Sequence, residues 1–232
     1  MKILIVDDSA THRKVAQVVL KEHKLTVVGS YEEAETLLTP QTDRDEVQHL
    51  LAKAGYATDF NPYRKEVTAE ERRAFQVAEE KAEQEATSYP DFDVVLLDLL
   101  LPASKKQQGS VGQKFVGQEM PLGTTLALLA LKQGIKRVAI VTDTGHHDHP
   151  ASAAFDIFRG NASGKDGNEV FNIGEVRMLC DNFNVTQPFD EKTCETTSWE
   201  FLESPEEKAK YPERKGVFWA KAWHKTLAKL LK

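Results

Sequence analysis

Cysteine is scarce in this sequence of 232 residues, and long apolar runs and an excess of basic residues are missing. Two cysteines, Cys180 and Cys194, are too few for a disulfide framework, so we expect reduced thiols in a cytoplasmic protein. No apolar run approaches the roughly 20 residues of a membrane span, and no basic leader precedes the first apolar segment. We therefore expect neither membrane insertion nor secretion. Acidic residues outnumber basic residues 36 to 30, which argues against a nucleic-acid-coating protein, and we expect no DNA-binding domain.

The pattern of apolar residues predicts an α/β fold. Hydrophobic residues make up 41% and charged residues 28% of the chain, which is typical of a packed protein. Short runs rich in Val and Ile favour strands buried on both faces of a parallel sheet, although a buried helical turn can mimic any one of them. Helical patterns lie between these runs, and the alternation predicts a doubly wound parallel sheet. The predicted strands are Lys2–Asp7, Leu25–Gly29, Asp93–Asp98 and Lys136–Thr142, and the predicted helices are 11–22, 32–38, 123–133 and 217–231.

Four polar segments interrupt this pattern, and we expect them as insertions into a single domain spanning residues 1–232. The first contains a predicted helix from Asp45 to Ala54 and a second that opens with the capping-box pattern Thr68–Glu71. The third contains a predicted hairpin around Asn172–Gly174. The insertions are expected at about 40–90, 103–122, 159–182 and 190–215.

Polar side chains follow three of the predicted strands. Asp7 and Asp8 end the first strand, Asp98 ends the third, and Thr142 with Asp143 ends the fourth. A single Asp at a strand end usually caps the next helix, but the joint occurrence favours a site, because the carboxyl ends of parallel strands share one edge of the sheet. Clustered carboxylates repel one another and normally hold a divalent cation, and oxygen ligands suit Mg²⁺. A carboxylate beside Mg²⁺ with a hydroxyl nearby is a place that could accept a phosphoryl group.

These segments resemble the receiver domain of bacterial two-component response regulators. The resemblance is carried by Lys2–Ser9, Val28–Ala34, Asp93–Pro102 and Val138–Thr142, and the matching frame covers about half of the chain. It implies a five-stranded parallel sheet of flavodoxin-like topology. It also implies that Asp98 accepts the phosphoryl group, that Thr142 contacts a phosphoryl oxygen, and that Mg²⁺ is bound by Asp7, Asp8, Asp98 and the backbone carbonyl of Leu100.

The sequence departs from the family pattern in two places. Receivers carry a Lys before a Pro at the end of the fifth strand, and the best local match puts Gln187 there, which brings no positive charge. Alternatively, the fifth strand is Glu175–Cys180 and the lysine arrives from a loop, with Lys165 and Lys192 as candidates. Asp143 stands where the family usually has a small residue, and its carboxylate could bind metal or repel a phosphoryl group.

Three functions are left open. The first is a stand-alone receiver that is phosphorylated on Asp98 by a histidine kinase, a phosphotransfer protein or a small phosphodonor and signals to a downstream protein partner. The second is a degenerate receiver that binds a partner through its inserted helices without phosphorylation. The third is a metal-dependent phosphohydrolase that uses the aspartates with the loop from His146 to His149, which could also ligate Zn²⁺. Lysines of the C-terminal helix are expected on its solvent-exposed face.

Overall fold

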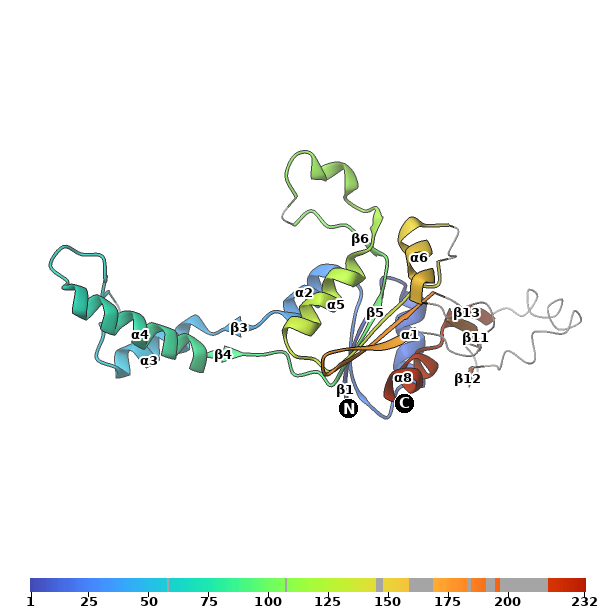
Figure 1. The fold of residues 1–232 in the computed structure, drawn as a ribbon, viewed down its shortest axis with the longest axis horizontal. Coiled ribbons are helices and arrows are strands. Elements are labelled where there is room, and N and C mark those ends of the chain that lie inside the picture. The colour runs from blue at the N-terminus through green and yellow to red at the C-terminus, as the bar shows by residue number, and fades with distance from the viewer. Residues whose placement is uncertain are drawn as a thin grey trace, which may run out of the picture. The chain divides into compact units, whose positions relative to one another are not determined.

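The computed structural model describes residues 1–57, 59–106, 108–144, 148–158, 169–182, 185–190, 195–196 and 217–232. The chain forms two compact units (Figure 1). One combines Met1–Leu38 with Asp91–Lys232, and the other is Thr39–Pro90. The second unit lies within the chain where the first insertion is expected.

A six-stranded sheet forms the centre of the first unit, in the order β2-β1-β5-β8-β10-β9. Five strands pair in parallel, and β9 pairs antiparallel with β10 at one edge. The architecture is therefore α/β with a mostly parallel sheet, and the expected count of five strands is corrected to six. The strands are β1 (Lys2–Val6), β2 (Lys24–Val28), β5 (Val94–Asp98), β8 (Arg137–Val141), β9 (Val170–Ile173) and β10 (Val176–Asp181).

The fifth parallel strand is β10, which corresponds to the alternative strand Glu175–Cys180. The segment 159–182 is therefore not wholly an insertion, because its last residues belong to the sheet. The hairpin expected there is present as β9 and β10, with Gly174 at the turn in a left-handed conformation (φ 60°). The segment reads as a hairpin from its local turn residues, whereas the parallel pairing of β10 with β8 is a long-range contact that turn residues do not reveal.

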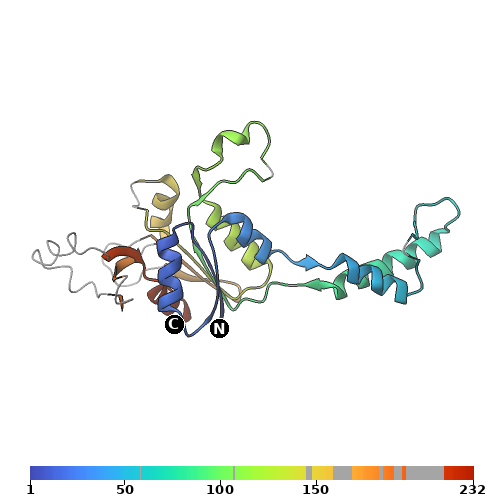
Figure 2. The same cartoon turned by 180° about the vertical axis from the view of Figure 1, so that it is seen from behind.

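Helices cover both faces of the sheet (Figures 1 and 2). Helices α1 (Ala10–Val19) and α8 (Trp223–Leu231) pack on one face, and α2 (Tyr31–Leu38) and α5 (Leu122–Lys132) pack on the other. Because successive strand residues point to opposite faces, Ile3 and Ile5 join the core under α1 and α8, whereas Leu4 and Val6 join the core under α2 and α5. Burial on both faces explains why these strands are apolar without alternation.

Two excursions leave the carboxyl edge of the sheet. The first is bounded by β6 (Leu101–Pro102) and β7 (Glu119–Met120), which pair antiparallel and enclose the 3₁₀ turn η1 (Gly112–Phe115). This ribbon occupies most of the expected polar loop 103–122. The second contains α6 (Pro150–Ala154) and the 3₁₀ turn η2 (Phe155–Phe158) after β8.

A small three-stranded antiparallel sheet has the order β12-β11-β13, with β11 (Thr186–Asp190), β12 (Glu195–Thr196) and β13 (Val217–Lys221). The prediction of one helix over 217–231 is wrong at its start, because residues 217–221 form β13 and α8 begins at Trp223. Val217, Phe218 and Trp219 favour strands, and pairing with β11 satisfies their backbone. The expected insertion 190–215 lies almost entirely outside the described residues.

The second unit is a helical hairpin on a short ribbon. The ribbon pairs β3 (Gln41–Thr42) with β4 (Thr87–Ser88), and α3 (Arg44–Lys53) and α4 (Ala69–Glu85) follow the positions expected for them. The predicted capping box is present, since Thr68 Oγ1 accepts from Glu71 N at 3.1 Å and Glu71 Oε2 accepts from Thr68 N at 2.8 Å. Val47, Leu51, Phe75 and Ala82 form its own small core.

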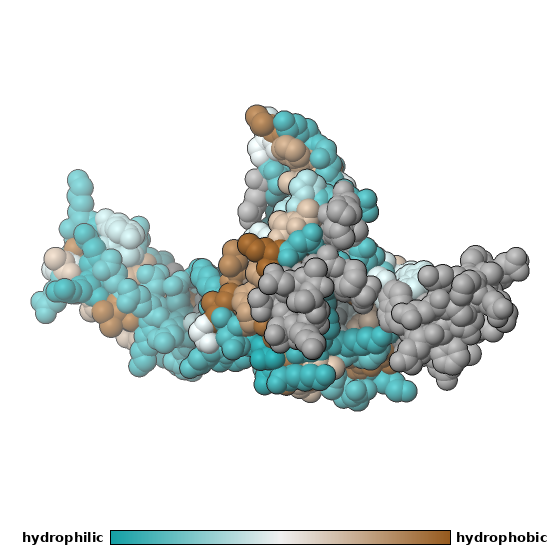
Figure 3. Space-filling model, turned by 45° about the vertical axis from the view of Figure 1, so that its right-hand side comes forward, coloured by the Kyte–Doolittle hydropathy of each residue, from teal (hydrophilic) through white to brown (hydrophobic). Residues whose placement is uncertain are grey.

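On the face drawn in Figure 3, most of the coloured surface is hydrophilic, and apolar residues gather in smaller patches. Among the helices that the structure describes, none is both long enough and apolar enough to cross a membrane.

Candidate functional site

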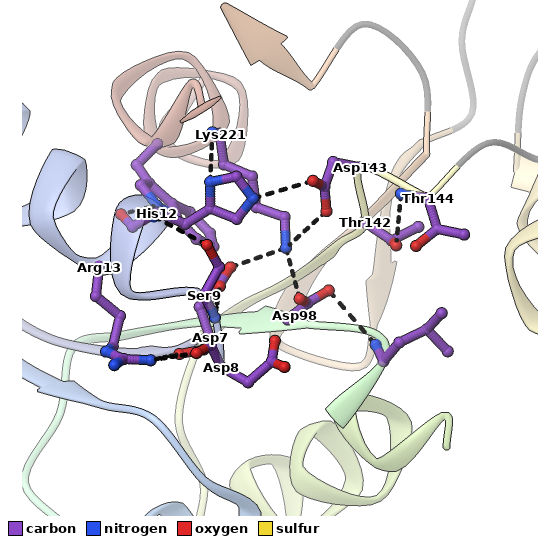
Figure 4. Close-up of polar contacts among 12 residues, drawn as sticks. Asp7, Asp8, Ser9, His12, Arg13, Asp98, Thr142, Asp143, Thr144 and Lys221 are labelled. Carbon is purple, nitrogen blue, oxygen red and sulfur yellow. Dashed lines mark hydrogen bonds and ion pairs between the residues drawn. The ribbon is translucent and has the colours of Figure 1, made fainter. Parts of the chain in front are cut away.

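Three carboxylates meet at the carboxyl edge of the central sheet. Asp7 directly follows β1, Asp8 is its neighbour, and Asp98 is the last residue of β5. One oxygen atom from each of these residues lies within 4.8 Å of the others. Asp7 is fully buried and Asp98 is 6% exposed, whereas Asp8 faces solvent. The adjacent parallel pairing of β1 with β5 thus brings these side chains together (Figure 4).

A lysine that the sequence does not single out lies between these carboxylates. Lys221 Nζ is 2.7 Å from Asp98 Oδ2, 2.8 Å from Asp7 Oδ2 and 3.4 Å from Asp143 Oδ1 (Figure 4). Its side chain is 1% exposed. A buried ammonium is tolerated only when anionic partners replace the water it has lost, and here three carboxylates do so.

Lys221 lies in the site because β13 of the small sheet ends beside the carboxyl edge of the central sheet. Lys221 ends β13, and the next residue, Ala222, donates its backbone N–H to Val185 O at 2.7 Å. Val185 follows shortly after β10, so the ammonium enters the site beside the end of the fifth parallel strand.

The structure differs from the expectation for Gln187. This residue lies in β11 opposite Ala220 of β13, and its side-chain Nε2 is buried without a hydrogen-bond partner among the described residues. The positive charge beside Asp98 comes from Lys221 instead. The two lysines considered as alternatives, Lys165 and Lys192, lie outside the described residues. One signal for Lys221 was available, because Val217–Lys221 is an apolar run that ends in a polar residue, as the predicted strands Lys2–Asp7 and Asp93–Asp98 do.

The loop after β1 is fixed by hydrogen bonds. Asp7 Oδ1 accepts from Ser9 N at 2.9 Å, and Ser9 Oγ accepts from His12 N at 3.4 Å as the N-cap of α1. Arg13 donates to the backbone carbonyls of Asp7 and Asp8, each at 2.7 Å. Residues of α1 and its cap therefore hold the acidic pair in place while one Asp7 oxygen remains on Lys221.

The turn after β5 is fixed by close packing. Leu100 N donates to Asp98 Oδ1 at 3.4 Å, so Leu100, whose carbonyl is expected as a metal ligand, lies in the same turn as Asp98. Gly123 N in α5 donates to Leu99 O at 3.0 Å. A Cβ on Gly123 would lie only 1.9 Å from the carbonyl oxygen of Asp98, so only glycine allows this approach.

Thr142 and Asp143 follow β8 on the other side of Asp98. Thr142 is fully buried, its N donates to Asp181 O at 3.1 Å, and its Oγ1 accepts from Thr144 N at 3.2 Å. Because the hydroxyl accepts here, its proton is still available for another acceptor. Asp143, which the sequence marks as a departure from the receiver pattern, contacts His12 Nε2 at 3.0 Å as well as Lys221.

The electrostatics of the site follow from burial and from this cluster of charges. Burial raises the pKa of Asp98 to about 7, with Lys221 opposing the shift and Asp7 adding to it. Burial, and then the neighbouring Asp7, also raise the pKa of Asp8. Burial opposes ionisation of Asp143, but the hydrogen bond from His12 and the charge of Lys221 outweigh it and lower the pKa of Asp143. Burial likewise opposes the charge on Lys221, yet Asp7, Asp98 and Asp143 raise its pKa.

The donor set suits a divalent cation. Three carboxylates contact the ammonium of Lys221, and a fourth, that of Asp8, lies close to Asp7 and Asp98, so the carboxylates outnumber the ammonium that balances them. The oxygens of Asp7, Asp8 and Asp98 are close enough to share one ion, and solvent reaches the site through Asp8. Mg²⁺ takes oxygen ligands, few carboxylates and several waters, so these residues match its requirements.

The histidine loop is only partly described. Residues 145–147, which include His146, lie outside the described residues. His149 Nδ1 accepts from Ala151 N at 3.1 Å as the N-cap of α6, so this side chain has a structural role. Of the two cysteines, Cys180 is a buried free thiol in β10 and Cys194 lies outside the described residues.

None of the protein-family models, curated proteins or solved structures that were compared with this chain matches it.

Proposed function

We propose that this chain is a response-regulator receiver of flavodoxin-like topology, in which Asp98 accepts a phosphoryl group with the help of Mg²⁺. The observation that carries the proposal is the buried ammonium of Lys221, held 2.7 Å from Asp98 and 2.8 Å from Asp7. The resemblance requires a lysine beside Asp98, and Lys221 fills this role from a segment that was predicted as part of a helix. The order β2-β1-β5-β8-β10 of the parallel strands also agrees with a flavodoxin-like sheet.

The reaction would proceed at the carboxylate of Asp98. One of its oxygens attacks the phosphorus of a phosphohistidine or a small acyl phosphate. A new O–P bond forms while the N–P or O–P bond of the donor breaks, and the donor leaves with the electron pair. Lys221 offsets the charge on the phosphoryl oxygens, and the Thr142 hydroxyl can donate to one of them. Mg²⁺, when bound by Asp7, Asp8 and Asp98, supplies the charge that keeps Asp98 ionised and neutralises the transferred group.

The partners that follow are a histidine kinase or phosphotransfer protein as donor and a downstream protein as target. Phosphorylation would shift a two-state equilibrium of the domain, because the dianionic group changes which contacts Lys221 and Thr142 make.

A degenerate receiver is the second candidate, and Asp143 favours it. Its carboxylate lies 3.4 Å from Lys221 and would compete with a phosphoryl group for the same ammonium. In this case the chain would bind its partner without being phosphorylated.

Intact-mass spectrometry after incubation with Mg²⁺ and a small acyl phosphate separates the two candidates. A receiver gains the mass of one phosphoryl group, and Asp98→Asn abolishes the gain. Asp91→Asn is the matched control, because it makes the same change at an exposed aspartate before β5, outside the site, and leaves the acceptor in place. Absence of any adduct on the unaltered protein, with beryllofluoride also failing to bind, would favour the degenerate receiver.

A further inference from the structure

His12 of α1 contacts β13, α8 and the loop after β8 around the candidate site. It lies on α1, is 6% exposed, and its ring contacts two different residues through its two nitrogens. Nε2 is 3.0 Å from Asp143 Oδ2, and Nδ1 accepts from the backbone N–H of Lys221 at 3.3 Å. In addition, the His12 carbonyl accepts from Trp223 Nε1 at 3.0 Å (the ring contacts are drawn in Figure 4).

These contacts define one tautomer. Because Nδ1 accepts a hydrogen bond from an amide that can only donate, the ring proton must be on Nε2. Nε2 therefore donates to Asp143, whose other oxygen contacts Lys221 Nζ. A single imidazole thus acts on Lys221 from both ends, directly at its backbone and through Asp143 at its ammonium.

Such a restraint is needed because a lysine side chain is long and flexible. Four rotatable bonds separate the backbone of Lys221 from its ammonium, and holding them in one conformation costs conformational entropy. The small sheet that carries Lys221 is separate from the central sheet. The bond from Lys221 N to His12 and the bond from Ala222 N to Val185 O are two of the contacts that hold the end of β13 against α1 and the segment after β10.

We propose that His12 is a positioning residue for Lys221, acting through the Lys221 backbone amide and through Asp143. The effect on phosphoryl transfer rests on the proposed function, whereas the effect on the placement of the ammonium does not.

The placement can be measured by the reactivity of the lysine. The folded protein is treated briefly with an amine-acylating reagent, and the modified fraction of each lysine is quantified by peptide mass spectrometry. Lys221 is buried and engaged in the unaltered protein, so it should react at least 100-fold more slowly than the exposed Lys53. In His12→Phe, which keeps an aromatic ring and loses both hydrogen bonds, we expect Lys221 to react at least tenfold faster, with Lys53 unchanged.

Three further variants make the result specific. His12→Gln restores an acceptor and a donor on one side chain, and should return the reactivity of Lys221 to within about threefold of the unaltered value. Asp143→Ala should also raise it, because this change removes both the link from His12 and a direct partner of the ammonium. His23→Phe makes the same change beyond the other end of α1, where the side chain is near Glu22, and should have no effect.

Equal Lys221 reactivity in the unaltered protein and His12→Phe overturns the proposal, as does failure of His12→Gln to restore slow reaction. If His12→Phe does not fold, His12→Leu takes its place, and equal Lys221 reactivity in His12→Leu and in the unaltered protein contradicts the proposal. The rate of Asp98 phosphorylation is measured in parallel, with at least a tenfold loss expected in His12→Phe. If the unaltered protein is not phosphorylated at all while the reactivities change as stated, the proposed function fails and the positioning role stands.

Discussion

The ammonium of Lys221 and the carboxylate of Asp98 form a 2.7 Å ion pair whose two side chains are only 1% and 8% exposed. Such a pair contributes little net stability as a unit, but removing one partner leaves the other as an unbalanced buried charge. A substitution of Lys221 or Asp98 is therefore expected to change both the stability of the domain and the proposed phosphorylation of Asp98.

Replacement of Lys221 by Met should destabilise the protein by about 3–5 kcal/mol at neutral pH, because Asp7 and Asp98 lose their shared cation. Urea unfolding followed by circular dichroism measures this. Lys136→Met is the control, since Lys136 pairs with Glu175 on the exposed surface and its loss should change little. A Lys221→Met protein as stable as Lys136→Met would contradict the burial of the ammonium.

Replacement of Asp98 by Asn should flatten the dependence of stability on pH. The pKa of Asp98 in the folded protein is about 7, above its unfolded value of 3.8. Between these values the folded state retains a proton that the unfolded chain has released. The stability that Asp98 contributes is therefore fully present below pH 4 and is lost as the pH rises through 7. Without divalent cations, the stability difference between the two proteins should therefore shift in favour of Asp98→Asn as the pH rises from 4 to 8. If the stability of both proteins depends on pH in the same way, Asp98 is not the group whose ionisation changes the stability.

Mg²⁺ should raise the stability of the unaltered protein. A ligand that binds only the folded state stabilises it by about 2.7 kcal/mol at one hundred times its dissociation constant. Thermal unfolding across a magnesium titration should show this rise, and Asp8→Asn should weaken it, since Asp8 offers an oxygen to the shared position. Asp91→Asn, which alters an exposed aspartate at the opposite end of β5, is the control. An equal response in Asp8→Asn and Asp91→Asn would mean that the ion binds elsewhere.

Replacement of Gly123 by Ala should displace the turn that carries Asp98. The added Cβ would lie 1.9 Å from Asp98 O and 2.9 Å from Leu99 Cα, both backbone atoms that cannot rotate away. We expect destabilisation by roughly 3 kcal/mol and loss of phosphorylation. Gly109→Ala is the control, because nothing lies within 4 Å of the place that its new methyl group would occupy. A Gly123→Ala protein with normal stability would show that α5 can shift without cost.

The central strands could be predicted because their signal is local. The runs ending at Asp7 and Asp98 are short, apolar and β-branched, and they form β1 and β5. That their carboxylates approach one another follows from parallel pairing, which places the ends of adjacent strands on one edge.

Lys221 could not be assigned because its surroundings are set by distant contacts. The residues from Val217 onward also suit an amphipathic helix, since the apolar residues Trp219, Trp223 and Leu227 lie four positions apart. Pairing with β11 overrides that pattern for the first five residues. A lysine next to a helix is normally solvated, and nothing local indicates that three carboxylates surround this one.

The ion pair between Lys221 and Asp7 joins residues 214 positions apart. On a translating ribosome, Asp7 and Asp98 emerge long before Lys221 has been synthesised. Until β13 has been made, the acidic side chains at the ends of β1 and β5 lack the ammonium that pairs with them. We therefore expect the domain to complete its fold only after the segment that carries Lys221 has been synthesised.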